Sequence, residues 1–157
     1  MKIISGAQTG VDRAALDAAM ELNIPCGGWR PQARKAEDGM ISEKYPVKEL
    51  AGADYRKRTR QNVIDSDGTV IIYFSYLSGG TEHTVLLCIK EQKPYFLIDA
   101  DELTASRAAE KLQNFVKKYS VSVLNVAGPR ASGEPKAYDY SKRMISKFIK
   151  IHQVQYE

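Results

Sequence analysis

The sequence predicts an α/β protein with three layers, in which helices cover both faces of a five-stranded parallel sheet. Short apolar runs, typical of buried strands, alternate along the chain with segments whose apolar residues recur every three to four positions, as in amphipathic helices. Glycine-rich loops follow several of these runs directly. The chain has 157 residues, the usual size of one domain, so we expect a single ligand-binding domain over residues 1–157.

Five apolar runs are the strand candidates. The clearest covers residues 69–74, where a continuous Val-Ile-Ile-Tyr-Phe run is typical of a strand buried on both faces. The others cover residues 2–5, 24–29, 95–98 and 122–126. Because helices separate them, the strands are expected to be parallel, with right-handed crossovers. We expect the first strand to neighbour the third, since glycine-rich loops follow both, in the order 2-1-3-4-5 counted along the chain.

Two helix candidates carry strong apolar signals. Between residues 11 and 22, six apolar residues recur at helical spacing, and Asp12, Asp17 and Glu21 are expected to face away from the core. Residues 81–92 are largely apolar, so this helix is expected to be deeply packed.

The remaining helix candidates are amphipathic or polar. Thr104 is a typical N-cap for a helix with a long apolar stripe over residues 105–119, and residues 141–152 form a final amphipathic helix. Residues 55–66 read as a polar helix. Its basic residues between positions 56 and 60 are expected on its surface, although Arg58 and Asn62 could reach inward.

Residues 30–54 show no convincing periodicity. A loop of this length inside a compact domain is usually functional or mobile. We therefore expect this segment to take part in the function or to move.

Composition excludes several classes of protein. Hydrophobic residues make up 43% and charged residues 27%, which argues against disorder and membrane embedding. The apolar start of the chain is too short for a signal peptide or a membrane span, so we expect the cytoplasm. Cys26 and Cys88 are expected to be reduced and buried, and no cysteine or histidine pattern indicates a metal site. The net charge of +4 suits an anionic ligand but would also suit nucleic acid.

The first glycine-rich loop reads SGAQTGVDR at residues 5–13, between the first strand and the first helix. Glycines let backbone N–H groups approach an anion, and the helix start adds unpaired N–H donors and the positive end of the dipole. The loop matches neither the P-loop nor GxGxxG. The alternative is a tight turn with an N-cap. The predicted anion contacts are Ser5, Gly6, Ala7, Gln8, Thr9, Gly10 and Arg13.

A second such loop, SGGTEHT at residues 78–84, follows the third strand and opens the apolar helix. Thr81 could cap the helix or bind phosphate. Glu82 would be the general base if the protein were an enzyme, although an acid at this position also suits the helix dipole. His83 is better explained as a solvent-facing or capping residue. The predicted ligand contacts are Gly79, Gly80 and Thr81.

Two further loops are weaker candidates. After the fifth strand, a Gly-Pro turn contains Gly128 and Arg130, and Arg130 would point toward the edge where ligands sit in open α/β sheets. In residues 27–39, Trp29 beside the basic Arg30 could stack on a flat ring and pair with its phosphate. The alternative is a solvated loop that Trp29 pins to the protein.

Five stretches together resemble the putative molybdenum carrier family. They are SGAQTGVDRAALD at 5–17, GGWRPQARKAEDGMI at 27–41, YRKRTRQNVIDSDGT at 55–69, SGGTEHT at 78–84 and NVAGPRASGEPKAY at 125–138. The family is similar to Rossmann-like ligand-binding domains that include the LOG, or lysine decarboxylase-like, proteins. The resemblance implies a Rossmann-like fold, a homo-oligomer, and a binding or carrier protein for a phosphorylated heterocycle. Molybdenum cofactor, a pterin with a terminal phosphate, or a nucleotide would be that ligand.

The chain departs from this family at two positions. The family usually reads SGGQTGVD, where this chain has Ala7, which restricts the loop backbone. The family often reads Gly-Trp-Cys-Pro, where this chain has Arg30, which removes a soft ligand for molybdenum. We therefore expect no metal bound by protein side chains.

Two other functions stay open on the sequence. LOG relatives cleave nucleoside monophosphates with a Gly-Gly-x-Gly-Thr loop followed by a glutamate, and Glu82 is placed differently here. A nucleic-acid binder is disfavoured, because aromatic residues make up only 9% and no basic–aromatic stripe is present.

Overall fold

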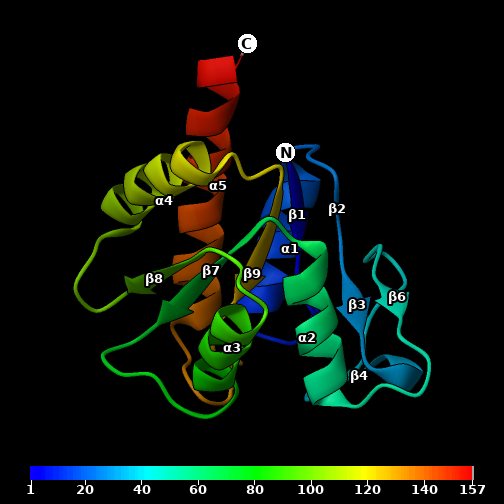
Figure 1. Cartoon of the computed structure of the whole chain (residues 1–157). Helices are drawn as coiled ribbons and strands as arrows, with labels where there is room; N and C mark the ends of the chain where they lie inside the picture. Colours follow the sequence, from blue (N-terminus) through cyan, green and yellow to red (C-terminus); the bar gives the residue numbers. More distant parts are fainter. Residues whose placement is uncertain (157) are drawn as a thin grey trace.

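A computed structural model describes residues 1–156 and shows an α/β fold around a five-stranded sheet (Figure 1). The strands are β1 (Lys2–Ile4), β2 (Cys26–Gly27), β7 (Gly68–Tyr73), β8 (Tyr95–Asp99) and β9 (Val123–Ala127). All pairings in this sheet are parallel, which confirms the predicted architecture.

The strand order is β2-β1-β9-β7-β8, so the expected neighbourhood of the first and third strands is wrong. The last strand, β9, lies between β1 and β7, with Leu124 opposite Ile3 and Val126 opposite Val70. The expectation assumed that two cooperating loops need adjacent strands. All parallel strands end at one edge, however, so the loops after β1 and β7 still reach that edge with the loop after β9 between them.

Helices cover both faces of the sheet (Figure 1). One face carries α1 (Val11–Glu21), α4 (Ala105–Tyr119) and α5 (Ala137–Tyr156), and α5 packs against both of the others. The other face carries α2 (Tyr55–Asp65) and α3 (Gly79–Lys90). This arrangement makes three layers, and it leaves the ends of α2 and α3 beside the carboxyl edge of the sheet.

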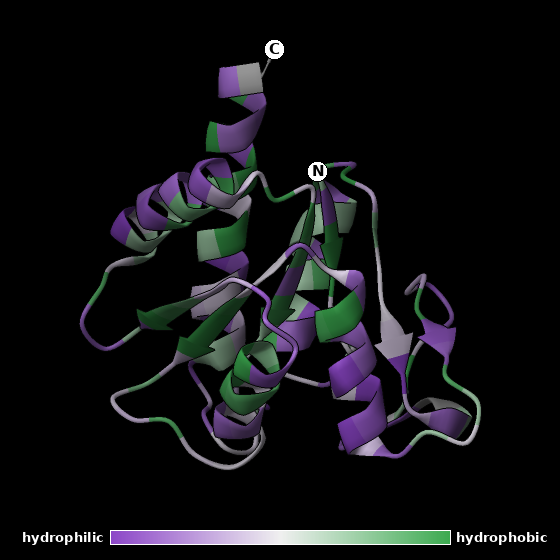
Figure 2. Ribbon diagram, in the orientation of Figure 1, coloured by the Kyte–Doolittle hydropathy of each residue, from purple (hydrophilic) through white to green (hydrophobic). Residues whose placement is uncertain are grey.

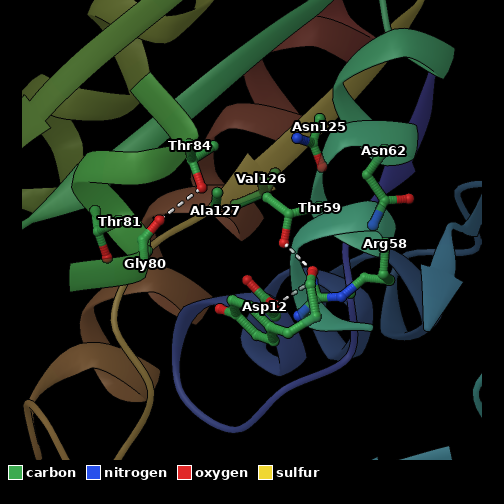
Figure 3. Close-up of a pocket in the computed structure, with 13 residues that line it drawn as sticks. Asp12, Arg58, Thr59, Asn62, Gly80, Thr81, Thr84, Asn125, Val126 and Ala127 are labelled. Carbon is green, nitrogen blue, oxygen red and sulfur yellow. Dashed lines mark hydrogen bonds and ion pairs between the residues drawn. The ribbon is translucent and has the colours of Figure 1, made fainter. Parts of the chain in front are cut away.

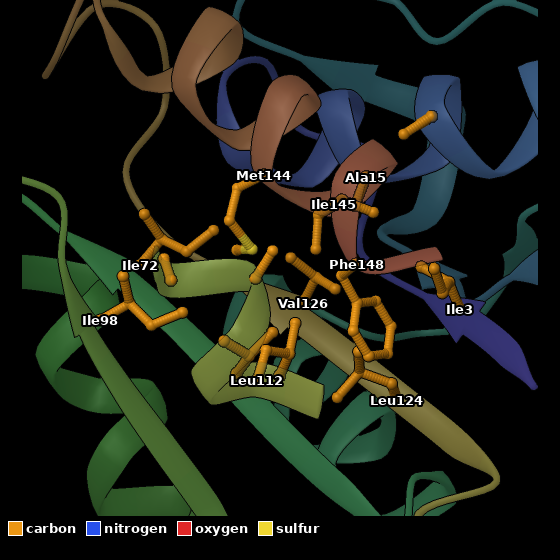
Figure 4. Packing of buried hydrophobic residues seen from close by; sticks show 14 of the residues in the cluster. Ile3, Ala15, Ile72, Ile98, Leu112, Leu124, Val126, Met144, Ile145 and Phe148 are labelled. Atoms are coloured by element: carbon orange, nitrogen blue, oxygen red, sulfur yellow. The ribbon is translucent and has the colours of Figure 1, made fainter. Parts of the chain in front are cut away.

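Strand β7 shows how the two faces receive alternate side chains. Val70 and Ile72 belong to the larger core under α4 and α5, which includes Phe148 (Figure 4). Ile71 points to the other face, where it packs with Leu87 of α3. The continuous apolar run therefore serves two cores, as expected for a strand buried on both sides.

Several helix predictions are confirmed and one is wrong. The apolar stripe of α1 is buried, and the Thr104 side chain accepts a hydrogen bond from the backbone N–H of Arg107, as an N-cap should. Helix α3 is not deeply packed, because Leu86 is 56% exposed and Ile89 is 55% exposed. Figure 2 shows this helix as largely hydrophobic and α2 as largely hydrophilic. The reason is that α3 packs on β7 and leaves its far side without a partner.

The segment without periodicity is built from very short elements. It contains β3 (Trp29–Arg30), which pairs with β6 (Lys48–Glu49), and β4 (Lys35–Ala36), which pairs with β5 (Gly39–Met40). A 3₁₀ turn, η1 (Gln32–Arg34), precedes β4. Two-residue strands are too short to show a period, which explains the missing signal. Four of the segment's side chains are buried against α1 and its preceding loop: Ala36, Ile41, Tyr45 and Val47.

Both cysteines are free thiols in this structure. Cys88 is buried, as expected, whereas Cys26 is only partly buried. Among residues 1–156, no helix has the length and apolar character needed to cross a bilayer.

Candidate functional site

A pocket lies at the carboxyl edge of the sheet, where β1 and β9 end and the first turns of α1, α2 and α3 converge (Figure 3). It holds about 320 Å³ of unfilled space, part of it open to solvent. Its lining is mostly polar. The residues that give it chemistry are Gly6, Asp12, Tyr55, Arg58, Gly80 and Thr81.

Arg58 of α2 is the buried cation of this pocket. The residue is 4% exposed, and its Nε has no hydrogen-bond partner. The guanidinium lies 4.4 Å from the centroid of the Tyr55 ring and against Gly6. A Cβ on Gly6 would come within 1.7 Å of Nη1, so glycine is what lets the guanidinium lie there. A buried guanidinium that lacks acceptors is costly, and an anion in the pocket would supply them.

Asp12 of α1 faces this guanidinium (Figure 3). Its Oδ2 lies 3.7 Å from Nη1 of Arg58, which is an ion-pair contact longer than a hydrogen bond. Burial raises the pKa of Asp12 to about 6, against the opposing effects of Arg58, the backbone N–H of Gln8, Arg13 and Arg130. Asp12 therefore changes protonation close to neutral pH, which is typical of functional carboxyl groups.

The start of α3 adds backbone donors to the same pocket. Gly80 and Thr81 line it, and the N-cap residue Ser78 makes no side-chain hydrogen bond to the helix. In the described part of the chain, no acceptor meets the N–H groups of residues 79–81. These donors and the positive end of the helix dipole make a suitable place for an anion.

The structure bears on the alternatives that the sequence leaves open for Thr81, Glu82 and His83. The helix begins at Gly79, so Thr81 lies inside its first turn and is not the N-cap. Glu82 is exposed and does not line the pocket, and neither does His83.

The loop after β1 is arranged differently, because acceptors within the loop and on neighbouring segments occupy its donors. The Ser5 hydroxyl donates to the Asp12 carbonyl at 2.7 Å and accepts from the Ala7 N–H at 3.4 Å. The Thr9 N–H donates to Oε1 of Gln8 at 3.0 Å. Ala7 itself has φ 62, a left-handed conformation that glycine adopts more easily, so the departure at this position has a cost in strain. This loop places Gly6 and Asp12 rather than cradling an anion with its amides.

Gly10, the last residue before α1, lies directly against the backbone that follows β9. It has φ 79, and a Cβ there would come within 2.4 Å of the Pro129 carbonyl. The Val11 N–H donates to that same carbonyl at 3.2 Å. The space that the sequence assigned to a ligand at Gly10 is therefore filled by the Pro129 turn. Gly128 lines the pocket and is also closely packed, since a Cβ there would come within 2.6 Å of the Ile72 carbonyl.

Arg13 is paired inside the protein. Its Nη2 donates to the Ala7 carbonyl at 2.9 Å, and its Nη1 forms an ion pair with Asp38. Next to this pair, the Glu37 carboxylate accepts hydrogen bonds from the hydroxyls of Thr9 and Ser132 and from the Ser132 N–H. The hydrogen bond from the Ser132 hydroxyl is the main cause that lowers the pKa of Glu37. Glu37 and Asp38 thus fasten the segment after η1 to the loop after β1 and to the turn after β9.

The structure does not bring all the predicted contacts together. Trp29 donates from its Nε1 to Asp65 and lines a separate hollow together with Lys2 and Ile4 of β1. Arg30 is buried in the small sheet, 3.6 Å from Glu49. Arg130 stays near the pocket, with its guanidinium 5.8 Å from the centroid of the Tyr55 ring. Ligand contact by any of these residues stays a prediction.

Sequence reasoning missed Asp12 as a site residue, and its expected outward orientation is wrong, since it is 7% exposed. Asp17 does not face away either: its carboxylate accepts from the hydroxyls of Tyr45 and Tyr138. A signal for the α2 face did exist. Tyr55, Arg58, Thr59 and Asn62 follow the i, i+3, i+4, i+7 spacing of one helical face, and the structure turns three of them inward: Arg58, Thr59 and Asn62.

Comparisons with known proteins agree with this architecture. Residues 3–149 match the family described as circularly permutated YpsA SLOG. No protein with a curated description matches the chain. A crystal structure of a putative molybdenum carrier protein from Syntrophus aciditrophicus SB is 43% identical, with a TM-score of 0.92 over 94% of each chain. The family name describes a circular permutation, and here the last strand occupies the centre of the sheet. The chain belongs to the circularly permutated YpsA SLOG family.

Proposed function

We propose that the chain is a cytoplasmic binding or carrier protein for a heterocyclic small molecule that bears a phosphate group. The observation that carries this proposal is the buried Arg58 guanidinium, which faces a polar pocket beside the open first turn of α3. A phosphate in that pocket would receive charge-assisted hydrogen bonds from Arg58 and backbone bonds from Gly80 and Thr81.

The cargo we propose is molybdenum cofactor or a nucleotide. The relative of known structure is named as a carrier of molybdenum, and both ligands carry phosphate. Among the described side chains, no group of three or more histidine, cysteine, aspartate or glutamate residues is placed to hold a metal. We therefore propose that the protein holds such a cargo through its phosphate and its organic ring.

The test is a calorimetric titration with pyrophosphate, AMP and GMP at low salt. Replacing Arg58 with methionine keeps much of the side-chain length and removes the charge, so affinity should fall about 10- to 100-fold. Arg60→Met on the same helix is the matched control, because Arg60 is exposed and paired with Glu91 outside the pocket. Equal affinities for the wild type and Arg58→Met would contradict the proposal, and so would no binding of any of the three anions.

A second candidate function is a nucleotide-processing enzyme of the LOG phosphoribohydrolase type. The observation in its favour is Asp12, a buried carboxyl group with a pKa of about 6 inside the pocket. Such a group can exchange a proton with a leaving base near neutral pH, a role for which Glu82 is badly placed. Incubation with nucleoside monophosphates tests it: release of free base that is lost in Asp12→Asn supports an enzyme, and no release supports a carrier.

A further inference from the structure

A second hollow adjoins the candidate phosphate pocket. Thr81 lines both, so the two hollows lie on either side of this residue, at the carboxyl edge of the sheet. The second hollow holds about 460 Å³ of unfilled space, part of it open to solvent. Its walls come from the chain after β7 and from the turn after β9. One of its walls is aromatic and another is acidic, whereas the phosphate pocket contains the Arg58 guanidinium.

Tyr76 forms the aromatic wall and is 73% exposed. The chain beneath it makes a γ-turn, in which the Tyr76 N–H donates to the Phe74 carbonyl at 2.9 Å and Ser75 has φ 70. This unfavourable conformation is held by two aspartates. Asp99 accepts from the Ser75 N–H at 2.9 Å, and Asp101 accepts from its hydroxyl. The backbone therefore holds an exposed phenol ring at the second hollow, where a flat ring can stack on it.

Glu134 forms the acidic wall and is half-buried. Its Oε1 accepts from the Lys136 N–H at 3.2 Å, and no cation among the described side chains pairs with its carboxylate. An ionised carboxylate only accepts hydrogen bonds, and it has room for several. It therefore favours a ring edge with two adjacent N–H donors, as guanine and pterins present through a ring N–H and a 2-amino group. Adenine offers a donor beside an acceptor, which matches a carboxylate less well.

We propose that this hollow binds the ring of the ligand, with Tyr76 as the stacking surface. Glu134 would accept hydrogen bonds from the ring N–H and the 2-amino group of a guanine or a pterin. This inference rests on the phosphate site proposed above. It assigns the ring to the hollow beyond Thr81 and not to Trp29, whose side chain lines a different hollow together with Lys2 and Asp65.

Calorimetric titration of GMP, AMP and pyrophosphate into the full chain tests the assignment. GMP should bind about 10-fold or more tightly than AMP, as a hydrogen bond to a charged group implies. Tyr76→Ala should lower the affinity for both nucleotides roughly 5- to 100-fold, because stacking does not distinguish the bases. The affinity for pyrophosphate should stay unchanged, because pyrophosphate has no ring. Glu134→Gln should remove the preference for GMP and leave AMP unchanged. Tyr119→Ala, an exposed tyrosine on α4, is the control.

The outcomes separate the two proposals. If pyrophosphate binds but GMP and AMP bind equally and neither variant matters, the ring site is overturned and the phosphate site stands. If neither nucleotides nor pyrophosphate bind, both are overturned. Tyr76 is exposed and Glu134→Gln is conservative, so both variants should unfold at the wild-type temperature, which thermal melts check.

Discussion

Replacing Asp12 with asparagine should change how stability depends on pH. The pKa of Asp12 rises from 3.8 to about 6, so the folded protein keeps this proton to higher pH than the unfolded chain does. Stability from this group is therefore fully present below pH 3.8 and is lost as pH rises through 6. Each pKa unit corresponds to ~1.4 kcal/mol, so ionising Asp12 costs the folded state ~3 kcal/mol in total. An asparagine at this position cannot ionise and avoids this cost.

Urea unfolding of both proteins between about pH 4 and pH 7.5 measures the effect. The free energy of unfolding of Asp12→Asn minus that of the wild type should increase by ~2 kcal/mol over this range, with unchanged m-values, because a part of the ~3 kcal/mol is already lost at the acidic end. Taking the difference cancels the other titrating groups. Asp139→Asn, at an exposed position early in α5, controls for removal of a negative charge. A difference that stays flat, or that decreases as pH rises, would refute the reasoning, because Arg58 would then compensate the buried carboxylate fully.

Three further predictions concern the site, its fastening and its assembly. Gly6→Ala should displace the Arg58 guanidinium and weaken pyrophosphate binding about 10-fold or more. Unchanged binding would show that Arg58 is not the anion contact. Glu37→Ala removes the acceptor that joins the segment after η1 to Thr9 and Ser132, so trypsin should cleave within residues 30–54 faster than in the wild type, and equal rates would argue against the fastening role. The exposed Leu86 and Ile89 of α3 predict a homo-oligomer, which light scattering should detect at micromolar concentration. The double change Leu86→Lys, Ile89→Lys should dissociate it. A monomeric wild type would contradict this prediction.

Local patterns are enough to find most helices and strands. The run at 69–74, the stripe of α1 and the Thr104 cap depend on neighbours in sequence, and the structure has each within one or two residues of its predicted place. Strand order cannot be predicted in this way, because the sequence of an apolar run does not determine which other strand it pairs with. The central place of β9 depends on long-range packing, such as the close approach of Gly128 to Ile72, which no local pattern encodes.

The candidate site is predictable in position but not in detail. Parallel strands end at one edge, so glycine loops after them have to gather there. Which loop keeps open donors depends on distant acceptors, and the carboxylate of Glu37 and the carbonyl of Pro129 occupy the first loop. Asp12 was expected to face solvent because isolated charges usually do. It is buried because Arg58, from another helix, lies opposite.

Anion binding at Arg58 and the first turn of α3, and not on the loop after β1, is the central claim. A nitrogen-15 NMR titration with pyrophosphate tests it directly. The Gly80 and Thr81 amides and the Arg58 Nε–H should shift, and the Thr9 amide should stay unchanged. Shifts confined to Thr9 and its neighbours in the first loop, or no shifts at saturating pyrophosphate, would contradict the claim.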